Sequence, residues 1–235
     1  MTDYHFKDTR GLTIWTCVLA AAAIVLTLVN LCDDLYTTHL FRGVLEHDAA
    51  RTMALRTHVH ALITLQTTLN GTLILLWVVN VVLFCVWLYR SACNTRALGA
   101  QGLDYSPGWT VGYFFVPIAN LVLGYQCMRE VWKASHAPEN WSQIKNPPLL
   151  LAWWVTYIAA SATSRIASTM LKGVGTDMQA LLIASNIEMV GMALSMLAAG
   201  MYIRIVWRIS TVQRSHYLTP PMRMDEAALP DMQPG

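Results

Sequence analysis

The amino-acid sequence predicts an all-α integral membrane protein, built as a helical bundle of four spanning helices with one additional proline-broken segment. Composition is the first reason, because 55% of the 235 residues are apolar and 13% are charged. The second reason is the length of the uncharged runs, several of which reach the ~20 residues that cross a bilayer. We expect residues 1–212 to form a single transmembrane domain.

The first predicted span covers residues 12–32. It follows a short N-terminus that carries Lys7 and Arg10, and two acidic residues, Asp33 and Asp34, come directly after it. No small-residue cleavage site stands at its far end, so the run is typical of an uncleaved membrane helix and not of a signal peptide.

The second predicted span covers residues 61–89, which are free of charge. This run is longer than a bilayer requires, so we expect the helix to project beyond the membrane. Residues 33–60 are expected to form an outer, partly helical loop. The loop contains six residues of types that can bind a metal ion: His39, Glu46, His47, Asp48, His58 and His60. The spacing disfavours a metal, because no two of them stand one helical turn apart, at i and i+4.

The third apolar segment, residues 109–128, contains Pro117 in its middle. A proline inside a helix removes a backbone donor and clashes with the carbonyl one turn back. We therefore expect this segment to re-enter the membrane or to lie at its surface, and a full crossing, with five spans in all, is the alternative. Asn120 is expected to satisfy carbonyl groups that the break sets free.

The stretch that follows, residues 126–135, alternates charged and aromatic side chains and is typical of an amphipathic helix at the cytoplasmic interface. Trp132 would anchor this helix, while Arg129 and Lys133, one turn apart, would face lipid phosphates. The candidate binding residues are Pro117, Asn120, Arg129, Glu130, Trp132 and Lys133.

The residues in and around these two segments resemble the central motif of a bacterial membrane family, domain of unknown function 4328. The shared series is Gly108-Trp109, Phe115-Val116-Pro117, Asn120 and Glu130-Val131-Trp132. The resemblance covers roughly residues 75–213, including a closing pattern that ends at Gln213. The family often has a second proline shortly after the asparagine, where this chain has Gly124, so a sharp second break is not expected here. The resemblance implies a bacterial inner-membrane protein without implying an activity.

The last two predicted spans are residues 148–171 and 178–206, and each contains one charged residue, Arg165 and Glu188. The short connection between the spans makes an antiparallel hairpin in which the two charges lie at similar depth. An unpaired charge inside a membrane is costly, so we expect a buried ion pair. It would either fix the register of the hairpin or respond to protons or ions.

The distribution of lysine and arginine predicts the orientation through the positive-inside rule. The four-span arrangement collects on one side Lys7, Arg10, Arg90, Arg96, Arg129, Lys133, Lys145, Arg204, Arg208, Arg214 and Arg223, and on the other Arg42, Arg51, Arg56 and Lys172. Both termini are therefore expected in the cytoplasm. Residues 213–235 are polar and proline-rich, as in a disordered tail.

Three classes of function follow from these observations. The leading one is a non-enzymatic membrane protein that binds a lipid or a protein partner, including a second copy of itself, through residues 126–135. The second is a small transporter or channel that uses Arg165 and Glu188, and the third is a metal- or redox-linked protein that uses the outer histidines. The sequence offers no catalytic constellation, no cofactor motif and no basic surface for nucleic acid.

Overall fold

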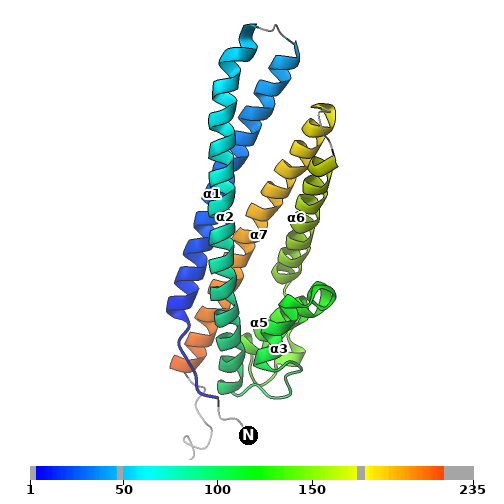
Figure 1. Cartoon of the computed structure of the whole chain (residues 1–235). Helices are drawn as coiled ribbons and strands as arrows, with labels where there is room; N and C mark the ends of the chain where they lie inside the picture. The colour runs from blue at the N-terminus through cyan, green and yellow to red at the C-terminus, as the bar shows by residue number, and fades with distance from the viewer. Residues whose placement is uncertain (1–3, 47–49, 174–177, 220–235) are drawn as a thin grey trace, which may run out of the picture.

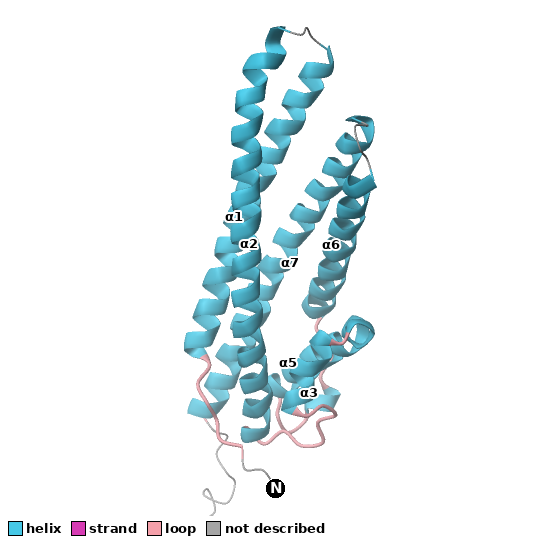
Figure 2. Ribbon diagram, viewed as in Figure 1, coloured by secondary structure: helices cyan, strands magenta, loops and turns pink. Residues whose placement is uncertain are grey.

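The computed structural model describes residues 4–46, 50–173 and 178–219. Most of these residues are helical, and no strand occurs among them (Figure 2). The elements in chain order are α1 (Arg10–Glu46), α2 (Ala50–Ala97), α3 (Pro107–Gly112), a 3₁₀ turn (Tyr113–Phe115), α4 (Pro117–Ala119), a π turn (Asn120–Gly124), α5 (Tyr125–His136), a 3₁₀ turn (Trp141–Gln143), α6 (Pro148–Gly173) and α7 (Met178–Leu218).

Four long helices make the bundle, with α1 beside α2 and α6 beside α7 (Figure 1). The short elements α3 and α5 gather at the end where α1 begins and α7 ends, which we call the α5 end. At the opposite end, α1 and α2 extend further than α6 and α7 do. Residues 33–46 and 50–60 belong to these two helices, so the predicted outer loop is helical wherever the structure describes it.

Three of the helices in the described part of the chain are long and apolar enough to cross a membrane. They are Arg10–His39 of α1, Thr64–Ala97 of α2 and Gln179–Leu218 of α7. The bent pair Pro107–Phe115 and Pro117–His136 meets the same test when taken together. The all-helical prediction is therefore confirmed, and the helices indicate a membrane protein. The predicted span at 148–171 is present as the helix α6 but is not among the helices that pass this test.

Small side chains bring α6 and α7 together. Ala160 and Ala167 of α6 are buried, as are Ala184, Gly191 and Ala198 of α7, which recur every seven residues. A Cβ added at Gly191 would lie 3.1 Å from the Ser164 hydroxyl oxygen. Close approach through small residues is the usual way in which membrane helices pack.

The largest apolar cluster lies toward the α5 end. Its fully buried side chains come from four helices and include Trp87, Leu88, Met128, Leu150, Ile205, Val206 and Ile209. The buried face of α5 packs into this cluster, so α5 closes one end of the bundle.

The chain bends sharply at Pro117, as the sequence predicts. Val116 has extended backbone angles (φ −94°, ψ 110°) and Pro117 opens the next helical turn, because a residue before proline avoids the helical region. The axes on either side differ by 102°. After the bend, the π turn leads into α5 without a second break.

Gly124 and Trp154 explain how the bend is packed. A Cβ at Gly124 would lie 3.0 Å from the Trp154 ring and 2.7 Å from the Asn120 Oδ1 atom, so glycine allows this close approach. The Trp154 indole N–H donates to the Leu121 carbonyl oxygen at 3.0 Å. Asn120 was expected to satisfy freed carbonyl groups through its amide N–H groups; its side-chain oxygen is buried without a hydrogen-bond partner, which leaves that expectation untested. Trp154 supplies one donor to a carbonyl group at the bend.

Candidate functional site

The residues predicted at the amphipathic stretch divide between two sides of α5. Glu130 points inward and is 5% exposed, while Arg129, Trp132 and Lys133 are half-buried. Arg129 lies over the Tyr125 ring at 5.9 Å, and Trp132 stacks on the His136 ring with centroids 4.6 Å apart. Pro117 is exposed at the bend. The structure thus places these residues on one segment without enclosing a cavity between them.

Glu130 has a structural role that the sequence did not indicate. Its carboxylate accepts the backbone N–H of Asp104 at 2.7 Å and that of Tyr105 at 3.3 Å. Burial raises the pKa of this carboxyl group, and the two N–H donors oppose that rise. Arg96 donates to the Tyr105 carbonyl oxygen on the same loop. Glu130 therefore holds the connection between α2 and α3 against α5.

Arg165 and Glu188 do not form the predicted ion pair; no such pair joins them within the described residues. The face of α6 toward α7 contains the buried Ala160 and Ala167. Arg165 stands two residues before Ala167, which turns it about 200° around the helix axis, and it is exposed. The two charges lie at similar depth, as predicted, but Arg165 faces away from α7.

A buried polar network ties the ends of α1, α2 and α7 together. The Ser210 hydroxyl accepts the Trp87 indole N–H at 2.9 Å and lies 2.6 Å from the Thr13 hydroxyl oxygen. One turn further, Gln213 is fully buried and donates to the Ser91 carbonyl oxygen at 2.9 Å. Residues 213–218, predicted as the start of a tail, are the last turns of α7; the tail after 219 lies outside the described residues.

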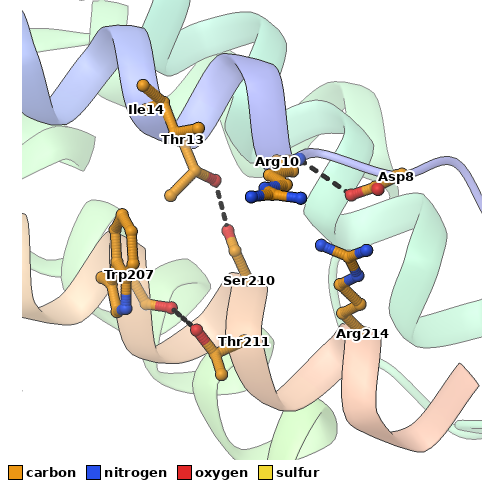
Figure 3. Close-up of a pocket in the computed structure, with 8 residues that line it drawn as sticks. All are labelled: Asp8, Arg10, Thr13, Ile14, Trp207, Ser210, Thr211 and Arg214. Carbon is orange, nitrogen blue, oxygen red and sulfur yellow. Dashed lines mark hydrogen bonds between the residues drawn. The ribbon is translucent and has the colours of Figure 1, made fainter. Parts of the chain in front are cut away.

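Beside this network, a pocket of about 330 Å³ opens between the start of α1 and the end of α7. Figure 3 shows the guanidinium groups of Arg10 and Arg214 pointing into the space between the two helices, with Asp8 beside them. The Asp8 carboxylate accepts the backbone N–H of Arg10 at 2.9 Å. The remaining lining residues are Thr13, Ile14, Trp207, Ser210 and Thr211.

The pocket is charged at one end and apolar at the other. Ile14 stands one turn beyond Arg10 on α1, and Trp207 stands two turns, about 10 Å, from Arg214 on α7. Trp207 is 54% exposed and Ile14 is 38% exposed. Two arginines against one aspartate leave the charged end cationic. We therefore refer to the lining of Arg10, Ile14, Trp207 and Arg214 as the α1–α7 pocket.

This pocket could not be predicted from the sequence, because its two halves stand about two hundred residues apart in the chain. Two local patterns were visible in the sequence: an isoleucine one turn after Arg10, and a tryptophan two turns before Arg214 on one helix face. Only the antiparallel packing of α1 against α7 brings the two patterns together.

Comparisons with curated proteins and with solved structures return no match. A protein-family model, by contrast, matches residues 51–211, a stretch that includes the bend at Pro117, all of α5 and α6, and α7 as far as Thr211. The match extends over more than half of the chain. The chain therefore belongs to the family described as Domain of unknown function (DUF4328).

Proposed function

We propose that this protein is a non-enzymatic integral membrane protein that binds an anionic phospholipid in the α1–α7 pocket. The observation that carries the proposal is the order of side chains along both helices. Arg10 and Arg214 stand at the end of the bundle, where a phosphate would lie, and Ile14 and Trp207 follow toward its middle, where an acyl chain would run. Arginine recognises phosphate through paired N–H donors, and tryptophan is favoured at membrane interfaces.

The arrangement in the membrane that fits this proposal has four spans, α1, α2, α6 and α7. The helix α6 packs along α7 in the antiparallel direction, so it would recross a membrane that α7 crosses. The positive-inside rule then favours a cytoplasmic α5 end in a bacterial inner membrane. The α1–α7 pocket would open to the inner leaflet, whose anionic lipids attract basic side chains.

The bent segment would dip into the same leaflet and return. Side chains around the bend are strongly exposed although they are apolar: Phe115 is 65%, Ile118 is 85% and Val122 is 56% exposed. An exposed apolar cluster of this kind is unfavourable in water and marks a surface that contacts lipid or protein. A re-entrant tip would bury it among acyl chains.

Lipid binding can be tested on the purified full chain by native mass spectrometry with phosphatidylglycerol and phosphatidylcholine at equal concentration. We expect phosphatidylglycerol to be retained preferentially by the wild-type protein. The double change Arg10→Gln with Arg214→Gln should remove the preference. Arg208→Gln is the matched control, because Arg208 is exposed on the same helix but does not line the pocket.

Two results would contradict the proposal. One is equal retention of the two lipids by the wild-type protein. The other is an unchanged preference in the Arg10 and Arg214 variant, which would assign lipid selectivity to another surface. Soluble glycerol phosphate is tested as a competitor of phosphatidylglycerol. If it competes as well as the whole lipid does, the apolar end of the pocket contributes nothing to the affinity.

The two alternative functions have less support. A transporter based on Arg165 and Glu188 would need the two charges to meet, and Arg165 is turned away. For a metal- or redox-linked role, the side chains of His58 and His60 lie outside the part that the structure describes, as does all of His47. Among the described residues, no three His, Cys, Asp or Glu side chains are grouped to hold a metal.

A further inference from the structure

A second polar cluster lies at the other end of the α1–α7 contact, far from the lipid pocket. Three residues of α1, one turn apart on a single face, are buried: Asn30 is 1%, Asp34 is 7% and Thr38 is 8% exposed. The Asn30 amide donates to the Asn70 side-chain oxygen at 2.8 Å, and the Gln66 amide donates to Asp34 at 2.6 Å. These contacts tie α1 to α2.

The helix α7 adds a second carboxylate to this cluster. The hydroxyl oxygens of Thr38 and Ser185 are 3.3 Å apart. Because α1 and α7 are antiparallel, one turn back along α1 and one turn forward along α7 reach the same level, and these steps lead to Asp34 and Glu188. The two carboxyl groups are close enough to interact electrostatically.

No basic side chain balances these two carboxylates among the described residues. Asp34 accepts a hydrogen bond from Gln66 of α2, and the charged groups near enough to act on it are Glu188 of α7 and Asp33 of α1. The arginine of α6 at the same level, Arg165, is exposed on the far side of its helix. A buried carboxylate beside a half-buried one is costly in a membrane protein when neither has a counter-charge, so a bound cation would stabilise the pair.

A buried oxygen with no partner points to a bound cation. The side-chain oxygen of Asn30 is buried and accepts no hydrogen bond in the described structure, although it stands one turn from Asp34 on the same face. Buried polar atoms are almost always paired, so such an atom requires a partner. An amide oxygen beside two carboxylates is the ligand chemistry of hard cations such as Ca²⁺ and Mg²⁺.

The depth of the cluster makes it reachable from the aqueous phase. Asp34 lies roughly 36 Å along α1 from Arg10, which exceeds the ~30 Å thickness of the hydrocarbon layer. With Arg10 at one membrane surface, Asp34 lies at the level of the opposite surface.

We propose that Asn30, Asp34 and Glu188 form a binding site for a hard divalent cation. The site is independent of the lipid pocket at the α5 end. It would join α1 and α7 at the membrane surface opposite to the termini, so the cation would stabilise the bundle there.

The test uses the purified full chain in detergent at a pH where both carboxylates ionise. Thermal unfolding is measured with increasing CaCl₂ or MgCl₂, against choline chloride and NaCl at matched ionic strength. We expect a saturable rise in melting temperature with at least one divalent ion, and saturable binding of the same ion by calorimetry. Both responses should disappear in the double variant Asp34→Asn with Glu188→Gln. Asp33→Asn is the matched control, because it removes a charge of the same type at the same depth, and it should retain both.

The ion-induced shift is compared within each variant, so a change in the intrinsic stability of the double variant does not affect the result. The proposal is overturned if no divalent ion acts beyond the effect of ionic strength on the wild-type protein. It is also overturned if the double variant responds as the wild type does. If the wild-type protein is instead stabilised by acid and indifferent to metals, the two carboxylates share a proton and the metal site does not exist.

Discussion

Replacing Gln213 by leucine should destabilise the α5 end of the bundle, although the new side chain has a similar volume. Gln213 is fully buried in the network described above. Its amide donates to the Ser91 carbonyl oxygen and, at 2.8 Å, to the Ser135 hydroxyl, and its own oxygen accepts the Asn94 amide at 3.3 Å. Leucine removes all three hydrogen bonds and opens little space.

The expected magnitude follows from what the partners retain. Ser135 still donates to the Val131 carbonyl oxygen, and the Asn94 amide still donates to the Lys7 carbonyl oxygen. Both side-chain partners therefore keep one bond, and the Ser91 carbonyl lies inside helix α2, so the loss should be near the net value of about 0.5–1.5 kcal/mol per hydrogen bond and not the larger cost of an orphaned group. We expect Gln213→Leu to lower the free energy of unfolding by about 2–4 kcal/mol.

Unfolding by SDS titration, followed by tryptophan fluorescence, measures this free energy. Gln143→Leu is the matched control, because Gln143 is exposed in the 3₁₀ turn before α6, and it should change stability by less than about 0.5 kcal/mol. A double-mutant cycle with Ser135→Ala should give a coupling of about 0.5–1.5 kcal/mol. A Gln213→Leu variant as stable as the control would refute the assignment of stability to this network.

Three other outcomes are expected. Trp154→Phe should lower stability by about 1 kcal/mol more than Trp153→Phe, because only Trp154 donates to the Leu121 carbonyl oxygen at the bend. Equal losses would show that this hydrogen bond does not contribute to stability. Arg165→Gln should change stability by less than about 0.5 kcal/mol because its side chain is exposed, and a large loss would show that Arg165 has a partner after all. In a variant without the five native cysteines, Ala97→Cys and Ser142→Cys should both resist an impermeant thiol reagent in intact cells; labelling of one alone would mean that the bent segment crosses the membrane.

Apolar runs in the sequence were sufficient to predict the long helices, and Pro117 was sufficient to predict the bend. The helix ends were harder to predict. Residues 33–60 are polar enough for a loop, yet they contain no proline and only one glycine, Gly43, so few of them disfavour a helix. Polar residues in the sequence indicate where the chain leaves the membrane, but a helix can continue beyond that point. This distinction explains why α1 and α2 are longer than the spans predicted from hydropathy.

The direction in which a side chain points around its helix axis was also hard to predict. The depths of Arg165 and Glu188 followed from counting residues, but their direction depends on which face of α6 packs against α7. Small residues at 160 and 167 determine that face, and their spacing was a usable signal. Gln213 had no such signal, because a polar residue in a polar stretch is indistinguishable from a solvated one until the network around it is seen.

The two proposed sites share the helices α1 and α7, so their independence is itself a prediction. Hydrogen bonds join these helices at both ends, between Thr13 and Ser210 and between Thr38 and Ser185. Both pairs fit one antiparallel register, which opposes sliding of α7 along α1. Without a second arrangement of the pair, a ligand at one end has no state to favour at the other. We therefore expect phosphatidylglycerol to change the apparent affinity for the divalent ion by less than about twofold. A larger change, matched by an equal effect of the ion on lipid affinity, would show that α1 and α7 exchange between two registers.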